Sequence, residues 1–114
     1  MGWHAPTDVE WTTLSVILGG ATIAGGKMKS TGTTYWNSPN TSATNESGFS
    51  VLPGGYRAND DGSFYIIRNI AFFWSATELD NGFAWNSVLY YNTSNVSNDI
   101  NRKSVGASVR CLRD

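Results

Sequence analysis

The two rarest reactive side chains in this sequence are one histidine and one cysteine. They are His4 and Cys111, and they lie near opposite ends of the chain. A lone histidine without a nearby cysteine or a partnered carboxylate is a poor general acid or base, so we expect His4 to have a structural role near a helix N-terminus. One cysteine can form no internal disulfide and no cysteine-rich zinc site. We expect Cys111 to be a buried core residue, as free cysteines commonly are.

Carboxylates in two acidic turns could bind a metal or act as acid and base. Residues 59–62 and 78–81 bring carboxylate and amide oxygens together, but calcium requires six to eight oxygen ligands. Asp-Gly and Asp-Asn pairs are also common in ordinary turns, and no carboxylate pair has a spacing typical of catalysis. We therefore predict no catalytic residue, no metal and no cofactor. Five charged residues are instead expected to include half-buried ion pairs that fix loops: Glu46, Arg57, Glu78, Arg110 and Arg113.

The composition predicts one domain, residues 1–114, and excludes two classes of partner. Apolar residues make up 40% of the chain, which is enough for a core, whereas only 15% are charged. The net charge is −1 without any stretch rich in lysine or arginine, so nucleic acid is not an expected partner. No apolar run reaches the roughly 18 residues of a membrane-spanning helix, so no direct membrane insertion is expected. No signal-peptide pattern is present either.

The first third of the chain predicts two helices. Thr7 and Glu10 are spaced as a capping box. The helix that follows has apolar side chains at helical spacing and ends at the glycine pair 19–20; they are Trp11, Leu14, Ile17 and Leu18. A shorter helix is predicted over residues 22–29, although its two glycines weaken it. Residues 30–47 are predicted to form a long ordered loop anchored by Tyr35 and Trp36.

The remainder of the chain predicts short strands separated by turns. Strands are expected over residues 49–52, 54–57, 63–67 and 72–75. Residues 83–91 alternate more clearly, with Trp85 and Leu89 on one face and Val88 and Tyr90 on the other, where Asn86 indicates water. A loop over residues 92–103 and a final strand over residues 104–112 complete the expected α+β fold.

Seven motifs, in order along nearly the whole chain, resemble one family. This family is the Fibrobacter succinogenes major paralogous domain, and the motifs are Gly2-Trp3-His4-Ala5-Pro6-Thr7-Asp8, Gly25-Gly26-Lys27-Met28-Lys29, Trp36-Asn37-Ser38-Pro39-Asn40, Thr44-Asn45-Glu46-Ser47-Gly48-Phe49, Leu52-Pro53-Gly54-Gly55-Tyr56-Arg57, Phe73-Trp74-Ser75-Ala76-Thr77-Glu78 and Ser108-Val109-Arg110-Cys111-Leu112-Arg113-Asp114. The family is widespread in bacterial surface proteins.

The resemblance implies a C-type lectin-like fold of the formylglycine-generating-enzyme branch. In this fold, two helices pack on a small, twisted, mostly antiparallel sheet with long ordered loops. It also implies an extracellular or surface-displayed location, on a cell or a virion. Formylglycine-generating relatives use a cysteine pair, whereas this chain has only Cys111. The oxidase activity is therefore not expected here.

The same fold branch includes the variable proteins of diversity-generating retroelements, whose rewritten C-terminal residues form a ligand-binding face. Adenine mutagenesis of asparagine codons would leave apolar and aromatic residues scattered among asparagines, and residues 71–110 have this character. Exposed aromatic side chains on a rigid scaffold make an effective contact surface. The predicted variable, ligand-binding face consists of Phe72, Leu79, Gly82, Phe83, Asn86, Val88, Tyr90, Ser97, Asp99, Ile100, Val105 and Ala107.

A second interpretation remains open. The same domain could be an invariant adhesion or carbohydrate-binding module, in which the unusual apolar residues simply pack beneath loops. In either case the predicted function is non-enzymatic binding of a protein or glycan ligand on a cell or viral surface. The sequence names neither the ligand nor the oligomeric state.

Overall fold

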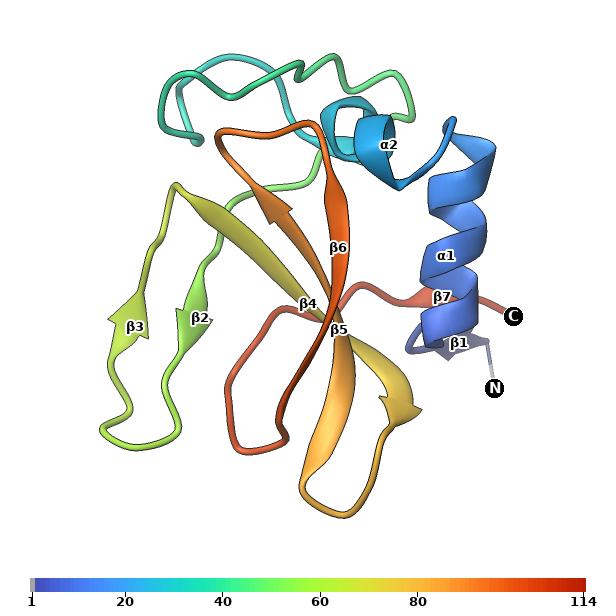
Figure 1. The fold of residues 1–114 in the computed structure, drawn as a ribbon, viewed down its shortest axis with the longest axis vertical. Helices are drawn as coiled ribbons and strands as arrows, with labels where there is room; N and C mark the ends of the chain where they lie inside the picture. Colours follow the sequence, from blue (N-terminus) through green and yellow to red (C-terminus); the bar gives the residue numbers. More distant parts are fainter. Residues whose placement is uncertain (1) are drawn as a thin grey trace.

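The computed structural model describes residues 2–114 and shows an α+β fold (Figure 1). The main sheet has three antiparallel strands in the order β4–β5–β6, and two small antiparallel pairs, β1–β7 and β2–β3, lie beside it. The elements along the chain are β1 (Trp3–His4), α1 (Asp8–Ile17), α2 (Ala21–Met28), β2 (Tyr56–Arg57), β3 (Phe64–Tyr65), β4 (Ile70–Glu78), β5 (Phe83–Tyr90), β6 (Val96–Arg102) and β7 (Leu112–Arg113). The predicted α+β class, with two helices and small antiparallel sheets, is confirmed.

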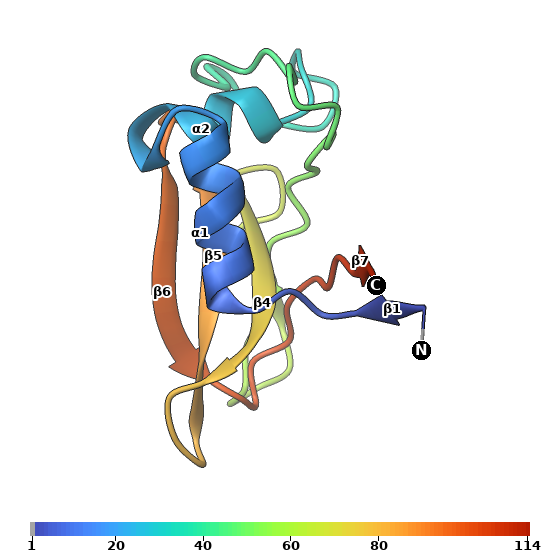
Figure 2. The ribbon, with the colours of Figure 1, turned by 90° about the vertical axis from the view of Figure 1, so that its right-hand side faces the viewer.

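The two faces of the main sheet have different neighbours. Helix α1 lies against one face, and the β2–β3 hairpin lies on the other side (Figures 1 and 2). Strand β6 forms one edge of the sheet, whereas the opposite edge, β4, is bonded to the C-terminal segment through Trp74 N–H and Ser108 O at 3.0 Å. Pairing of β1 with β7 brings the two ends of the described chain together. The result is a sheet with one helix-covered face and one helix-free face.

The capping box predicted at the start of α1 is confirmed. Thr7 caps the helix by accepting from Glu10 N–H at 3.1 Å, and the Glu10 carboxylate accepts from Thr7 N–H at 3.0 Å. Trp11 is buried, and Leu14 and Leu18 pack against the core. Ile17 departs from the prediction, since its side chain is exposed. None of the helices within residues 2–114 has the length and apolar character needed to cross a membrane.

His4 lies near the N-terminus of α1 between two carboxylates, consistent with the expected structural role. Its Nε2 lies 3.0 Å from Glu10 and its Nδ1 lies 2.8 Å from Asp114. Hydrogen bonding to Glu10, and then to Asp114, raises the pKa of His4 above its usual 6.5. The imidazolium therefore stabilises the fold below pH 6.5, and this contribution is lost as the pH rises through the folded-state pKa.

We expect an NMR titration of His4 to give a pKa above 6.5. The substitution Glu10→Gln preserves the capping-box geometry but removes the charge beside the imidazole, so it should lower this pKa. A His4 pKa at or below 6.5 in the unsubstituted protein would contradict the hydrogen-bonded geometry.

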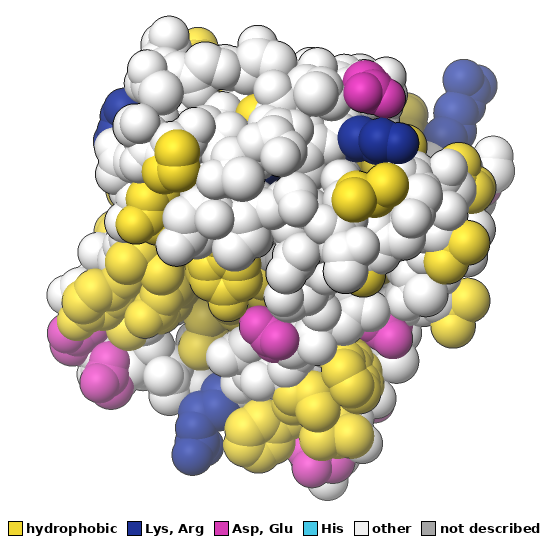
Figure 3. Space-filling model, turned by 45° about the horizontal axis from the view of Figure 1, so that its top comes forward, with side chains coloured by type: hydrophobic (Ala, Val, Ile, Leu, Met, Phe, Trp, Pro, Cys, Tyr) yellow, Lys and Arg dark blue, Asp and Glu magenta, His cyan; other side chains and the backbone are white. Residues whose placement is uncertain are grey.

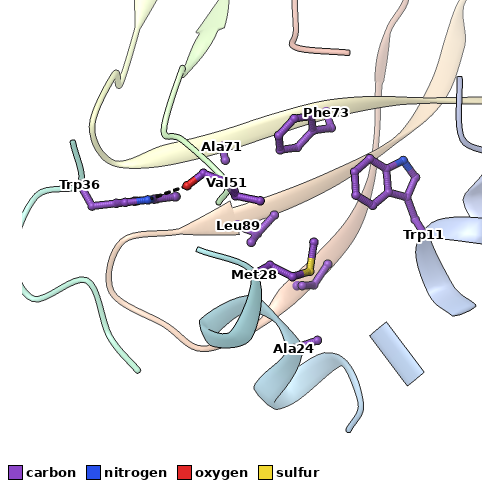
Figure 4. Close-up of a cluster of buried hydrophobic side chains, with 9 residues drawn as sticks. Trp11, Ala24, Met28, Trp36, Val51, Ala71, Phe73 and Leu89 are labelled. Atoms are coloured by element: carbon purple, nitrogen blue, oxygen red, sulfur yellow. Dashed lines mark hydrogen bonds between the residues drawn. The ribbon is translucent and has the colours of Figure 1, made fainter. Parts of the chain in front are cut away.

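The main core lies between the helices and the sheet (Figure 4). Trp11 packs against Phe73 with ring centroids 5.4 Å apart, and Met28 and Leu89 are fully buried beside them. Trp36 anchors the long loop, because its ring is buried and its Nε1–H donates to Val51 O at 3.0 Å. The predicted anchoring role of Trp36 is confirmed, whereas Tyr35, its predicted partner in this role, is exposed.

Three strand predictions are wrong. Residues 96–102, predicted as loop, form β6, because their backbone pairs with β5 along seven consecutive residues. Residues 104–112, predicted as one strand, contribute isolated bridges at Gly106 and Ser108 and the first residue of the short strand β7. Residues 49–52 contribute a single bridge between Val51 and Lys29. In each case pairing with a distant segment, rather than local propensity, determines whether a strand forms.

Two expectations about side chains near the C-terminus are also wrong. Cys111 is exposed rather than buried. It belongs to an exposed segment, residues 108–114, whose strand β7 pairs only with the two residues of β1. Arg110 does not pair with a carboxylate within residues 2–114. Its guanidinium instead lies 4.5 Å from the ring centroid of Phe49. Glu78 pairs with Lys103 and Glu46 pairs with Lys27, and both of these ion pairs are largely exposed.

Candidate binding hollow on the helix-free face

A hollow of about 540 Å³ is lined by residues of the main sheet, of the β2–β3 hairpin and of the loop after β6, and by none of α1. Strand β4 contributes Phe72, β5 contributes Tyr90, β6 contributes Asp99, and the loop after β6 contributes Val105. The register explains how the first three meet, because Ile70 pairs with Tyr90 and the Phe72, Val88 and Ser97 positions lie side by side across the three strands. Side chains two residues apart share a face of a sheet.

Six of the twelve predicted face residues line this hollow, and they come from four separate segments. They are Phe72, Phe83, Tyr90, Asp99, Ile100 and Val105. Phe83 and Ile100 follow the opposite strand alternation and lie toward the β4–β5 turn, where the sheet is strongly twisted. These six residues lie up to 33 positions apart in the sequence, from 72 to 105.

The other six predicted residues do not line the hollow. Leu79 and Gly82 are exposed in the β4–β5 turn, and Ser97 and Ala107 are half-buried. The expectation that Asn86 and Val88 face water is wrong, since their exposed fractions are 1% and 0%.

A second hydrophobic cluster buries Val88. Ile70, Phe72 and Val88 form its centre, and Tyr56 and Val105 pack over them from outside the main sheet. The C-terminal segment is held there because Arg57 N–H donates to Gly106 O at 2.8 Å. The helix-free face is therefore a packed layer whose outer surface forms the hollow.

Two side chains in the hollow have unused hydrogen-bonding capacity. The Asp99 carboxylate and the Arg102 guanidinium make no hydrogen bond or ion pair within residues 2–114, although Arg102 lies 5.4 Å from the ring centroid of Phe83. Burial and the nearby Asp99 charge raise the pKa of Tyr90 above its usual 10, so its hydroxyl stays protonated at neutral pH. The hollow therefore offers an acceptor, a cationic donor and a hydroxyl among aromatic rings.

The backbone beneath Tyr90 is fixed by a buried lysine, Lys29, which is not part of the face predicted from the sequence. Lys29 has no exposed surface, and its Nζ donates to Thr41 O, Tyr90 O and Thr93 O at 3.0, 3.0 and 2.9 Å. Burial lowers the pKa of Lys29 to about 8, so the ammonium persists at pH 7. Lysines are usually exposed, so the residue type alone gave no signal.

Four other hollow residues were not selected from the sequence: Tyr56, Asn59, Asn101 and Arg102. Asn101 and Arg102 lie in β6, which had been interpreted as a loop. Asn101 also donates to Asn86 Oδ1 at 2.8 Å and so fixes a buried amide beneath the face. Predicting residues 96–102 as a strand would have identified Asn101, because alternation along β6 places Asp99 and Asn101 on the same face as Val88.

No group of three or more histidine, cysteine, aspartate or glutamate side chains within residues 2–114 could hold a metal ion. The acidic turn at residues 59–62 is built from internal hydrogen bonds. Asp60 accepts from Asp61 N–H at 2.8 Å, and Asp61 accepts from Ser63 N–H at 2.9 Å and from the Tyr65 hydroxyl at 2.9 Å. These bonds lower the pKa of Asp61, the Ser63 bond most strongly.

The fold and this surface define an α+β domain with a recessed, aromatic-lined face. The chain matches the Fibrobacter succinogenes major domain over residues 1–113 and belongs to that family. The resemblance carried by the sequence motifs is thereby confirmed at the level of the family. No curated protein and no solved structure matches the chain.

Proposed function

We propose that this domain is a non-enzymatic binding module and that the hollow holds its ligand. One observation carries this proposal: Phe72, Phe83, Tyr90, Asp99, Ile100 and Val105 converge on the same hollow from four segments. Concave surfaces that combine aromatic side chains with a few polar groups are typical ligand sites. The open donors and acceptors of Asp99 and Arg102 support the same interpretation, because they can be satisfied by a ligand.

Diversification of this face is the finer part of the proposal. The scaffold we propose is C-type lectin-like, and the protein is proposed to be the variable protein of a diversity-generating retroelement, displayed on a cell or viral surface. The hollow supports this, because residues such as Tyr90 and Asp99 reach the surface while Val88 and Asn86 hold the layer beneath. Surface side chains can then change without loss of the core.

An invariant adhesion or carbohydrate-binding module is the second candidate. Aromatic rings can stack on the apolar face of a sugar, and Asp99, Asn59 and Arg102 can bond hydroxyl groups. A glycan array, read with and without a chelator, tests this candidate. Chelator-independent binding of one glycan class by every natural copy of the domain would favour it over diversification.

We expect Tyr90→Ala and Asp99→Asn each to weaken binding to ligands captured by this face at least tenfold. Tyr90 loses its ring and Asp99 its charge, while the sheet backbone stays paired. The measurement is surface plasmon resonance with whichever array or display ligand binds the unsubstituted domain. Ile17→Ala, on the exposed side of α1, is the control and should change neither affinity nor Tm. Equal affinity in all three variants would place the binding site elsewhere.

A further inference from the structure

A second exposed surface lies beside the hollow and is strongly apolar. Four consecutive residues from β3 into the turn after it, Phe64, Tyr65, Ile66 and Ile67, expose 68%, 40%, 46% and 57% of their surface. We call these four residues the hairpin patch. Figure 3 shows hydrophobic side chains gathered over this hairpin and a separate group near the β4–β5 turn. Contiguous exposed apolar patches of this kind mark interaction sites.

The backbone of the hairpin patch is held in an unfavourable conformation. Ile66 has φ 50° and Arg68 has φ 78°. Positive φ is a genuine outlier for a β-branched residue such as isoleucine. Such strain persists where the surroundings impose it, and it concentrates at functional positions.

Arg68 and Gly55 impose this conformation. The Arg68 guanidinium donates to Asn37 Oδ1, Thr34 O and Thr33 O at 2.9, 2.9 and 3.0 Å. A Cβ on Gly55 would lie 2.2 Å from Tyr65 O, so the turn packs directly on that glycine. The turn is therefore tied to residues 33–37 and to Gly55, and it presents Ile66 and Ile67 to solvent.

Aromatic rings connect the hairpin patch to the hollow without a break. Tyr65 stacks on Tyr56 with ring centroids 5.6 Å apart, and Tyr56 contacts Phe72 at 5.9 Å. Tyr56 and Phe72 line the hollow. The two surfaces thus form one continuous face, with the hollow at its centre and the exposed hairpin patch along its flank.

Charged side chains lie at both ends of this face. Asp60 and Asp61 lie in the turn of the β2–β3 hairpin, where Arg57 donates to Gly62 O at 2.9 Å. At the other end Arg102, the last residue of β6, lines the hollow, and Lys103 follows it. Lys103 is paired with Glu78, whereas Arg102 makes no ion pair within residues 2–114. Protein interfaces commonly combine a desolvated apolar centre with a charged rim.

We propose that the ligand of this face is a protein, which contacts the hairpin patch and inserts a side chain into the hollow. This inference rests on the proposed function. The aliphatic side chains of Ile66 and Ile67 offer a sugar neither hydrogen bonds nor a flat ring, but they match apolar protein side chains. The partner carries basic groups opposite Asp60 and Asp61 and an acidic group opposite Arg102.

The experiment uses a phage-displayed library of random 16-residue peptides selected on the unsubstituted domain. Enriched peptides are then tested by surface plasmon resonance against Ile67→Ser in the hairpin patch, Tyr90→Ala in the hollow and Val16→Ser on α1, where Val16 is also exposed. We expect both Ile67→Ser and Tyr90→Ala to weaken binding at least tenfold, and Val16→Ser to leave it unchanged.

A fourth variant separates binding from folding. Ile66→Asn places a residue that tolerates positive φ at the strained position, so we expect Tm to rise by about 2–5 °C. The same substitution removes an apolar contact, so peptide affinity should fall at least fivefold. Weaker binding by a more stable protein cannot be explained by partial unfolding.

The remaining outcomes overturn the inference in distinguishable ways. Peptides or array glycans that require Tyr90 but not Ile67 would show that the hollow alone is the binding site. This result would refute a protein ligand that contacts the hairpin patch. Peptides that require Ile67 but not Tyr90 would refute both the continuous face and the proposed function. Failure of the library to enrich any peptide above the level seen on Ile67→Ser would also refute the protein ligand.

Discussion

We expect Lys29→Met to lower the free energy of unfolding by about 3–5 kcal/mol, because three buried carbonyl oxygens lose their hydrogen-bond donor. The three carbonyl oxygens of Thr41, Tyr90 and Thr93 lose their shared donor. Methionine fills the volume but donates no hydrogen bond. Native domains unfold with a free energy of roughly 5–15 kcal/mol, so the expected loss is a large fraction of the total stability.

Urea unfolding of Lys29→Met and Lys27→Met tests this prediction. Lys27 lies two residues earlier at the end of α2, and its only ion pair within residues 2–114 is a 4.0 Å contact with the exposed Glu46. Lys27→Met should therefore change stability by less than about 1 kcal/mol. Equal small effects for both lysines would show that the carbonyl cluster is satisfied without Lys29.

We expect Gly25→Ala to destabilise the domain by about 3 kcal/mol, at the upper end of the cost of ordinary overpacking. A Cβ at this position would lie 2.2 Å from Asn95 O and 2.8 Å from Ser94 O. Both atoms belong to the backbone of the loop between β5 and β6, which cannot rotate away as a side chain can. Helix α2 must move away from this loop, and the gain in helix propensity of about 1 kcal/mol does not compensate.

Gly82→Ala is the matched control for this steric argument. The nearest atom to its added Cβ is Asp80 Oδ1 at 3.8 Å, and Gly82 lies in the exposed β4–β5 turn. We expect its Tm to stay within about 3 °C of the unsubstituted value, whereas Gly25→Ala should lower Tm by at least 10 °C. A Gly25→Ala protein with unchanged Tm would contradict the close approach of α2 to residues 94–95.

Local sequence signals predicted those elements whose stability is largely local. The capping box of Thr7 and Glu10 fixed the start of α1, and the alternation around Val88 and Leu89 correctly separated the two faces of β5. These patterns depend on neighbours within a few residues, so one sequence is sufficient to read them.

Features that depend on distant segments were missed. The asparagines of β6 have low strand propensity, and pairing with β5 overrides it. Val88 was expected at the surface because the adjacent Asn86 is polar, but Tyr56 and Val105 cover this face from outside the sheet. Six of the twelve predicted face residues nevertheless line one hollow. Strand alternation and register together determine which of the strand residues meet there.

Sequencing the gene region that encodes residues 71–110 across its source population tests the central claim most directly. We predict variable codons at Phe83, Tyr90, Asp99, Ile100 and Val105, which line the hollow, and invariant codons at Asn86 and Val88, which support it. Diversification also predicts a near-copy repeat and a reverse transcriptase gene nearby. An invariant region, or substitutions as frequent at Asn86 and Val88 as around the hollow, would contradict a diversified binding face.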